Sequence, residues 1–466
     1  MFGQTQIGSD LVGEAASTQF GRGVSLSSDG SIVAVGANGD GNGGGSGRVL
    51  IYKLELGTWI QIGTDIDGEA VADNASKNIS LSSDGSIVAI GAPNNRGNGS
   101  NSGHVRIFKN VNAVWTQVGE DIDGEVEGDN FGAAVSLSSN GTIVAITSLI
   151  NTNDDTGAGQ VQIFKNINDA WTQVGGNMDG EAFDGISENV SLSSDGSTVA
   201  FGAIGAEYVR IFKNVNDVWT QVGGDIDGEE FNDQSGRSVS LSSDGSIVAI
   251  GANGNDGNGD NSGHVRIFKN VNNVWTQVGD DIDGKAALDE SGDVVSLSSD
   301  GSVVAIGANG NFGNSIYPGY VRIFKNIGNV WTQVGIDING DPAGDFFGDS
   351  VSLSSDGSTV AVGARGGDIN GINSGHVRIY NLSSVLSIDN FLNSQINLYP
   401  NPVNDRFTIQ LNQGLELEKV KIYNSLGQLI SSTTKNVVST THLPQGVYLV
   451  EMVTEKGRAS KKILVK

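Results

Sequence analysis

An acidic pentapeptide recurs along the chain, and its residue types could hold a metal ion. In its fullest form it reads Asp-Ile-Asp-Gly-Glu, with carboxylates at alternating positions. Such carboxylates can converge on Ca²⁺, a cation that takes about 6–8 oxygen ligands. The alternative is a solvated acidic turn in which glycine supplies a positive φ. The candidate calcium ligands are Asp65, Asp67, Glu69, Asp121, Asp123, Glu125, Asp225, Asp227 and Glu229.

Histidine and tryptophan recur with the same regularity. His104, His264 and His376 each stand in the sequence Ser-Gly-His-Val-Arg-Ile. Because they belong to separate units of a repeat, we do not expect them to share one metal site. We expect the tryptophans to cover packing between neighbouring units, with stacking against a glycan as the alternative. They are Trp59, Trp115, Trp171, Trp219, Trp275 and Trp331.

The familiar catalytic signatures are missing from the sequence. It contains no nucleophile elbow, no metalloprotease histidine pair and no phosphate-binding loop. So acidic a chain could still hold a carboxylate pair for glycoside cleavage. Catalytic residues usually break the symmetry of a repeat, and the carboxylates that do so here are Glu207 and Asp349.

A repeated hairpin provides the elements that would position these side chains. Its clearest copy is Val-Ser-Leu-Ser-Ser-Asp-Gly-Ser-Ile-Val-Ala-Ile-Gly-Ala, in which two apolar runs flank Asp-Gly, a strong β-hairpin signal. Each unit adds two more strand-like runs, the last of which contains tryptophan. Seven units of four strands predict an all-β, seven-bladed β-propeller. A β-solenoid is the alternative, although its repeat is normally shorter. The copies begin at Val24, Ile79, Val135, Val190, Val239, Val295 and Val351.

The lengths of the connections order the strands within each blade. Short turns join hairpin partners, whereas the long acidic step after the tryptophan strand crosses to the next blade. The Val-Ser-Leu-Ser strand is therefore innermost. The last unit lacks a tryptophan strand, but Thr5–Gly8 matches Thr276–Gly279. We therefore predict that the N-terminal strand completes the last blade and hides its edge. The acidic steps and the Asn/Gly loops should share one face, with a notch where Gly202–Tyr208 leaves almost no loop.

Composition and charge narrow the choice of partners. The 466 residues include 68 glycines, 6 prolines and no cysteine, which suits many short strands and excludes disulfides. The net charge is −26. Residues 395–466 hold 9 Lys+Arg and 5 Asp+Glu, so the remainder holds 18 and 48 and carries −30. Such an acidic body repels nucleic acid.

Neither a membrane helix nor a leader is visible in the sequence. No apolar run reaches the ~18 residues of a membrane helix. Met1–Gln4 lacks the basic and apolar regions of a signal peptide, so we expect that the sequence is truncated or begins after signal removal.

The repeat resembles a known family. Phe20-Gly21, Phe131-Gly132 and Phe347-Gly348 precede inner strands, and the second strand of each hairpin ends in Gly-Ala, once as Gly91-Ala92-Pro93. Blade 3 departs from the Gly-Ala ending with Thr147-Ser148. The pattern resembles the FG-GAP repeats of integrin α-subunit propellers and their bacterial relatives, over residues 1 to about 381. The family often binds Ca²⁺ in an Asp-rich loop between the first two strands. Here that place holds only Ser-Ser-Asp-Gly-Ser, too short to wrap the ion, so this site is not carried over.

The last part of the chain has a different composition and several short strands, which suggests a small Ig-like β-sandwich. It resembles the type A C-terminal sorting domain of the type IX secretion system, a domain that directs periplasmic proteins across the outer membrane and is usually removed afterwards. The predicted parts are a propeller at 1–382, a linker at 383–394 and the sorting domain at 395–466. The residues that carry the resemblance are Tyr399, Pro400, Asn401, Pro402, Gly446, Tyr448, Lys461 and Lys462.

These observations lead to three functional hypotheses. The first is a binding or adhesion propeller, secreted or displayed on the outer surface by way of the periplasm, that contacts an extracellular glycan or protein, with Ca²⁺ as its candidate cofactor. The second is a glycan hydrolase or lyase, and the third is a structural surface module without a specific ligand. In each case we expect a monomer that engages the type IX machinery and does not bind nucleic acid.

Overall fold

The structure is a computed structural model that describes residues 3–39, 44–150, 158–181, 184–310, 318–341, 344–386, 395–411, 415–424, 427–454 and 457–466. It forms two compact units, Thr5–Asn381 and a second that contains Leu382–Lys466. The predicted all-β fold is confirmed. A four-residue helix, α1 (Ser383–Leu386), starts the predicted linker, whose residues 387–394 lie outside the described residues.

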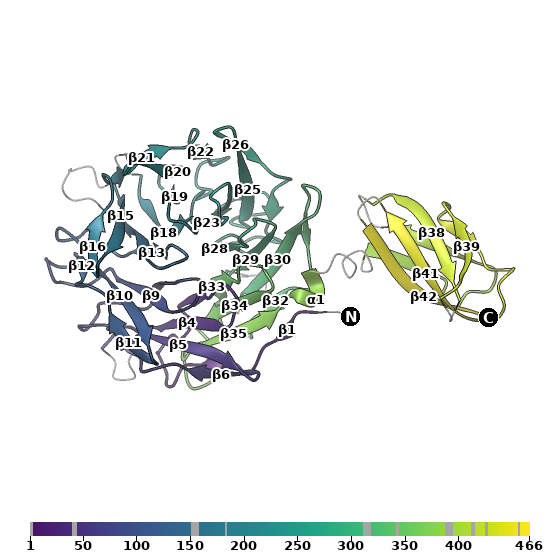
Figure 1. Cartoon of the computed structure of the whole chain (residues 1–466), viewed down its shortest axis with the longest axis horizontal. Coiled ribbons are helices and arrows are strands. Elements are labelled where there is room, and N and C mark those ends of the chain that lie inside the picture. The colour runs from purple at the N-terminus through teal and green to yellow at the C-terminus, as the bar shows by residue number, and fades with distance from the viewer. Residues whose placement is uncertain are drawn as a thin grey trace. The chain divides into compact units, whose positions relative to one another are not determined.

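The first unit is a β-propeller of seven antiparallel sheets (Figure 1). Blade 1 contains β3–β7, each later blade contains the next five strands, and blade 7 combines β33–β35 with β1 and β2. The inner strands are β3 (Gly23–Leu26), β8 (Asn78–Leu81), β13 (Ala134–Leu137), β18 (Ile186–Leu192), β23 (Ser238–Leu241), β28 (Val294–Leu297) and β33 (Phe347–Leu353).

The second strands are β4 (Ile32–Ala37), β9 (Ile87–Ala92), β14 (Ile143–Ser148), β19 (Thr198–Ala203), β24 (Ile247–Ala252), β29 (Val303–Ala308) and β34 (Thr359–Ala364). The third strands are β5 (Arg48–Glu55), β10 (His104–Val111), β15 (Gln160–Ile167), β20 (Tyr208–Val215), β25 (His264–Val271), β30 (Tyr320–Asn326) and β35 (His376–Asn381). The fourth strands are β6 (Thr58–Gln61), β11 (Val114–Gln117), β16 (Ala170–Gln173), β21 (Val218–Gln221), β26 (Val274–Gln277), β31 (Trp331–Gln333) and β1 (Thr5–Gln6).

A short fifth strand extends each blade beyond the predicted path of four. Strand β11 covers only Phe108–Val111 of β10, so the first half of β10 would be an open edge. The acidic step returns to cover His104 and Val105 with β12. The fifth strands are β7 (Ile66–Asp67), β12 (Ile122–Asp123), β17 (Met178–Asp179), β22 (Ile226–Asp227), β27 (Ile282–Asp283), β32 (Ile338–Asn339) and β2 (Leu11–Val12).

The inner hairpin motif is regular because its serines join neighbouring blades. One serine in each inner-hairpin turn donates its backbone N–H to the backbone carbonyl of the equivalent serine in the adjacent blade, at 2.8–2.9 Å. The chain of bonds closes on itself, from Ser28 through Ser83, Ser139, Ser194, Ser243, Ser299 and Ser355 back to Ser28. A second set joins the inner strands directly, as where Leu81 N–H donates to Ser25 Oγ at 3.0 Å. A change at one serine therefore affects two blades.

Close packing between blades explains the Phe-Gly and Gly-Ala signatures. A Cβ on Gly91 would lie 2.1 Å from the Gly132 carbonyl of the next blade, so a larger residue does not fit there. The adjacent Phe131 is 1% exposed. The second strands are buried almost throughout because a blade lies on each side of them.

The N-terminal strand closes the ring, as predicted. Strand β1 pairs antiparallel with β35, with Gln6 opposite Tyr380. Ile7 N–H donates to the Ile379 carbonyl at 2.7 Å, and the Ile7 carbonyl accepts the indole N–H of Trp59 from blade 1 at 2.9 Å. Figure 1 shows the first and last parts of this unit side by side.

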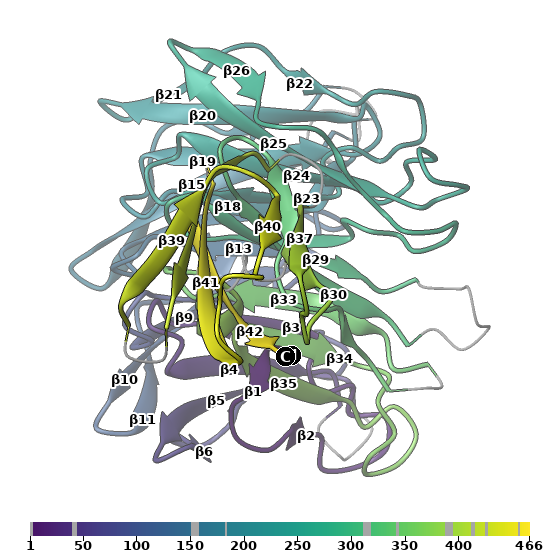
Figure 2. The ribbon, with the colours of Figure 1, turned by 90° about the vertical axis from the view of Figure 1, so that its right-hand side faces the viewer.

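The two faces of the ring differ in their loops. In the side view the hairpin turns between third and fourth strands point to one side, and the fifth strands β2 and β22 lie toward the other (Figure 2). The inner strands begin, and the second strands end, on the side of the long connections. This side is called the long-loop face below.

The second unit contains two sheets, as expected for a small β-sandwich. One sheet has the order β36-β37-β40 and the other β39-β38-β41-β42. Buried Phe407 and Met452 belong to different sheets, so apolar side chains fill both inner faces. The strands are β36 (Ile396–Tyr399), β37 (Arg406–Leu411), β38 (Leu417–Tyr423), β39 (Leu429–Thr433), β40 (Val437–Ser439), β41 (Gly446–Thr454) and β42 (Gly457–Val465).

Candidate functional site

The carboxylates of one acidic motif are divided between two blades. In the step after β6, Asp65 accepts hydrogen bonds from Arg48 at 2.9 Å and Gln61 at 2.7 Å, both within blade 1. Glu69 instead contacts Arg106 of blade 2 at 3.4 Å. Asp67 contributes its backbone carbonyl, which accepts from Arg106 at 2.6 Å. The motif therefore connects consecutive blades through arginine.

The other two predicted motifs follow the same division, with one exception. Asp225 contacts Arg210 at 3.1 Å, and Glu229 contacts Arg266 at 3.6 Å, while the Asp227 carbonyl accepts from Arg266 at 2.6 Å. Asp121 accepts from Gln117 at 2.6 Å. Asp123 and Glu125 line a groove beside blade 3, where the arginine position is occupied by Gln162.

Two of the three histidines combine with carboxylates from two successive motifs. His104 Nδ1 lies 3.5 Å from Asp121 and 4.0 Å from Glu69, and His264 lies 4.0 Å from both Asp281 and Glu229. Burial and the adjacent Arg106 lower the pKa of His104. The sequence reasoning correctly kept the histidines apart but missed that each one meets acidic residues from the neighbouring blade.

These clusters differ in chemistry from a calcium site. Each cluster offers one imidazole nitrogen and two carboxylates, with ligand atoms within 4.8 Å. Calcium prefers a shell of oxygens, whereas imidazole suits zinc and related metals. Arg106 and Arg266 also lie against the glutamates, where a cation would compete with them. Calcium binding by the acidic motifs stays a prediction.

The third histidine lies in a different environment. His376 Nδ1 is 3.5 Å from Asp345 Oδ1, and both atoms are buried without a hydrogen-bond partner. In blade 2 the equivalent aspartate, Asp73, accepts a hydrogen bond from Asn95, but Gly367 stands at that asparagine position in blade 7. Burial and nearby Asp341 raise the pKa of Asp345 to about 7.

The tryptophans hold neighbouring blades together, as expected. Each indole N–H donates to a backbone carbonyl at the end of the preceding blade's fourth strand, at 2.7–2.9 Å. Trp275, for example, donates to Val222. The tryptophan rings also line grooves at the rim between blades.

The blades differ in the side chains that they place near the propeller axis. The position two residues before the first valine or isoleucine of each inner-strand motif varies from blade to blade, whereas the motif that follows it repeats. This position holds Arg22, Lys77, Ala133, Glu188, Arg237, Asp293 and Asp349. All but Ala133 line a polar hollow of about 390 Å³ that also includes Glu290 and Arg365. We call this the axial hollow; it opens on the long-loop face.

Most charges in the axial hollow are paired. Lys77 bonds to Glu188 of blade 4, reaching past the small Ala133 of blade 3. Arg237 contacts Asp293 at 2.9 Å, and Asp293 also accepts from Asn309 at 2.8 Å. The hollow therefore contains a fixed network of side chains from several blades.

Three groups in the hollow, Arg22, Asp349 and Glu290, have pKa values shifted in the direction that disfavours their charged forms. Arg22 is half-buried and has no hydrogen bond or ion pair with another described residue; burial and nearby Arg365 lower its pKa. Burial raises the pKa of Asp349, although Arg365 contacts it at 3.1 Å. Burial and the charge of Asp293 raise the pKa of Glu290. Asp349 was singled out from the sequence; Arg22 and Glu290 were missed because their roles depend on neighbours in other blades.

Glu207, the other singular carboxylate, lies at the shortened loop of blade 4. It is equivalent to Gly103 of blade 2 and Gly263 of blade 5, and its φ is 60°. Its carboxylate accepts the Asn232 N–H at 2.5 Å, and its second oxygen is buried without a partner. Its position and contacts are those of a residue that holds the neighbouring step in place.

The sorting residues gather around the last strand of the second unit. Asn401 donates to the Lys462 carbonyl and accepts the Leu464 N–H, both at 2.9 Å. Gly446 and Tyr448 lie on β41, which pairs with β42, and Tyr448 Oη donates to the Pro444 carbonyl at 2.9 Å. Tyr399, Pro400 and Pro402 flank Asn401 in the chain, and Lys461 precedes Lys462 on β42. The motif thus fixes the C-terminal strand.

Comparisons with known proteins agree with both units. Residues 397–466 match the secretion system C-terminal sorting domain, and residues 226–268 and 332–380 match the FG-GAP repeat. A search of curated protein sequences finds no match. No helix among the described residues has the length and apolar character needed to span a bilayer.

Solved structures with a similar fold are β-propellers of low sequence identity. The Swd1 β-propeller domain of Myceliophteria thermophila is 10% identical, covers 82% of this chain and 100% of its own, and has a TM-score of 0.54. The periplasmic gluconolactonase of Pseudomonas aeruginosa is 17% identical, with coverages of 69% and 86% and a TM-score of 0.48. The first similarity supports the propeller fold and nothing finer. The chain is a β-propeller with FG-GAP repeats that carries the C-terminal sorting domain of the type IX secretion system.

Proposed function

We propose that the protein is a secreted or surface-displayed binding module whose ligand occupies the axial hollow. The sorting domain supports export to the medium or the cell surface through the type IX machinery. The observation that carries the binding proposal is the residue two positions before each inner-strand motif, which differs from blade to blade and lines the hollow in six of the seven blades.

The charges of the hollow favour a polar ligand that bears a carboxylate, such as an acidic glycan. Four of the propeller's basic side chains, Arg22, Lys77, Arg237 and Arg365, gather here in an otherwise acidic unit. Lys77, Arg237 and Arg365 already face acids. Arg22 remains to receive an anionic group, and a guanidinium binds a carboxylate through two parallel hydrogen bonds.

A glycan array that includes uronic-acid oligosaccharides tests this proposal with the full chain. We expect binding to acidic glycans, and a loss of at least tenfold in affinity in Arg22→Ala. The matched control is Arg96→Ala, which removes the same group from an exposed loop outside the hollow. Equal binding by Arg22→Ala and the natural chain would contradict the proposal. Absence of any glycan or protein ligand would favour the structural module instead.

A glycan hydrolase or lyase is the second candidate, and Asp349 is the observation that favours it. A buried carboxyl group with a raised pKa can remain protonated and act as a general acid. Glu290, also with a raised pKa, is the other carboxyl group of this kind in the hollow. Turnover of an acidic oligosaccharide that is lost in Asp349→Asn but kept in Arg96→Ala would support an enzyme. Binding without turnover would support the module.

A further inference from the structure

A groove between blades 2 and 3 lacks an arginine that five other blades contain. The third residue of the third strand is arginine in five blades, namely Arg106, Arg210, Arg266, Arg322 and Arg378, and it is Leu50 in blade 1. In blade 3 the equivalent residue is Gln162. The rest of the groove is built as in the other blades, so these blades show what the position is shaped to hold.

The arginines of blades 2 and 5 define the surroundings of the guanidinium. Arg106 lies over the ring of Phe108, with its Cζ 5.3 Å from the centroid, and Arg266 lies 5.4 Å over Phe268. Each donates to a backbone carbonyl of the preceding acidic step, at 2.6 Å. Each also faces the glutamate of that step, at 3.4 Å for Arg106 and 3.6 Å for Arg266.

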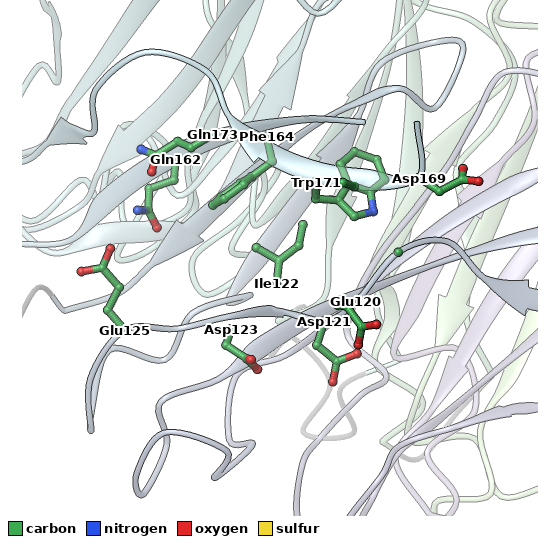
Figure 3. A pocket seen from close by; sticks show the side chains of 12 residues that line it. Glu120, Asp121, Ile122, Asp123, Glu125, Gln162, Phe164, Asp169, Trp171 and Gln173 are labelled. Carbon is green, nitrogen blue, oxygen red and sulfur yellow. The ribbon is translucent and has the colours of Figure 1, made fainter. Parts of the chain in front are cut away.

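The same three surroundings are present in the groove of blade 3. Phe164 corresponds to Phe108, the Asp123 carbonyl to that of Asp67, and Glu125 to Glu69. Figure 3 shows Glu125 and Gln162 on opposite sides of the groove, with Phe164 beside Gln162 and Trp171 farther along. Gln162 does not replace the guanidinium, because its amide donates to Asn177 of its own blade at 3.2 Å.

The groove without the arginine is larger than that of blade 5, and its ring is more exposed than those of blades 2 and 5. This groove has a volume of about 500 Å³, against about 350 Å³ for the groove that contains Arg266. Phe164 is half-buried, whereas Phe108 and Phe268 are 9% and 8% exposed. Among the described residues, none places a cation over Phe164 and no side chain donates to the Asp123 carbonyl. Burial and, to a smaller extent, the charge of Asp121 raise the pKa of Asp123.

We propose that this groove binds an arginine side chain of a partner polypeptide, whose guanidinium takes the place that Arg106 and Arg266 fill in their own blades. An aromatic face favours a planar guanidinium over an ammonium, and the carbonyl and carboxylate accept its N–H groups. The acidic surface around the groove attracts the basic partner. The site is separate from the axial hollow, so it does not depend on the function proposed there.

Peptide titrations with the full chain test this site. The probe is acetyl-Gly-Arg-Gly-amide, followed by ligand-observed NMR, with the lysine and citrulline peptides for comparison. Citrulline keeps the shape of arginine without its charge. We expect saturable binding of the arginine peptide and at least tenfold weaker binding of the citrulline peptide. Equal binding of arginine and citrulline, or of arginine and lysine, would overturn the assignment.

Two substitutions move the site within the protein. Gln162→Arg restores the internal arginine, a residue that five other blades accommodate, and should weaken peptide binding at least tenfold. Thr116→Arg adds the same charge at an exposed position outside the groove and should leave binding unchanged. Arg266→Gln should create a second groove and raise the stoichiometry from one peptide to two. Unchanged affinity in Gln162→Arg, together with unchanged stoichiometry in Arg266→Gln, would refute the proposal.

Discussion

Deletion of residues 1–9 tests how far the ring depends on its N-terminal strand. The deletion removes β1 from the edge of β35 and leaves blade 7 without a fourth strand. It also removes the Ile7 N–H bond to Ile379 and the carbonyl that accepts the Trp59 indole. The half-buried Ile7 side chain, which packs on the core between blades 7 and 1, is lost as well.

The size of the effect follows from these contacts. Each hydrogen bond contributes about 1 kcal/mol, and partial burial of one isoleucine contributes about 1 kcal/mol. With the ladder to β35, the loss is about 3–4 kcal/mol. A unit of the size of Thr5–Asn381 has an unfolding entropy of ~0.8 kcal/mol/K, so the melting temperature should fall by ~4–5 °C.

Differential scanning calorimetry of the full chain and the deletion measures this shift. Removal of residues 1–4 is the matched control, because it stops short of β1 and should not move the propeller transition. Trp59→Phe removes only the indole bond and should lower the transition by ~1 °C, since one hydrogen bond contributes about 1 kcal/mol. An unchanged transition in the 1–9 deletion would show that blade 7 is stable without β1, and the closure argument would be wrong.

Three further outcomes follow from single contacts. Trp275→Phe removes the bond to Val222 and should cost about 1 kcal/mol in a chemical unfolding measurement, with no effect if the indole contributes only packing. Asp345 has a raised pKa, so its charged form destabilises the fold, and the free energy of unfolding should fall as pH rises from about 4 to 7. Asp345→Asn should therefore raise the melting temperature at pH 8 but not at pH 4. Equal shifts of the melting temperature at the two pH values would contradict this prediction. Hydrogen bonds from Ser246 and Ser242 outweigh burial and lower the pKa of Asp244 in the folded protein. The Asp244 carboxylate therefore stabilises the fold fully above its unfolded pKa, and this stabilisation is lost as the pH falls through its lower pKa in the folded protein. A melting temperature of Asp244→Asn that falls with acid as steeply as that of the natural chain would count against this prediction.

Much of the scaffold was predictable because it depends on local sequence. The Asp-Gly turns, the alternating strands and the constant spacing predicted the blades, and the match of Thr5–Gly8 to Thr276–Gly279 predicted the closure that β1 and β35 make. Asp244 shows the physical reason. Its carboxylate accepts hydrogen bonds from Ser242 and Ser246, two residues away on either side, so the turn is specified by five consecutive residues.

The fifth strands were not predicted, because each one forms only where the fourth strand leaves part of the third strand unpaired. An eight-residue β10 paired with a four-residue β11 leaves an open edge, and only the assembled sheet shows that the acidic step covers it. The division of each acidic motif between two blades has the same origin. Asp65 and Glu69, which flank the two-residue strand β7, contact partners that belong to different sheets.

The acidic motif illustrates what each level decides. The sequence alone determined that carboxylates recur at a fixed spacing, and that Gln162 stands where other blades have arginine. The tertiary structure decided which carboxylates meet, because the ring places Glu69 beside Arg106 and His104 of the next blade. It also brought Arg22 and Asp349, 327 residues apart in the sequence, to one hollow at the axis. Local hydrogen bonding fixes a turn or a strand from its own residues, whereas a site made between blades exists only after the ring has closed.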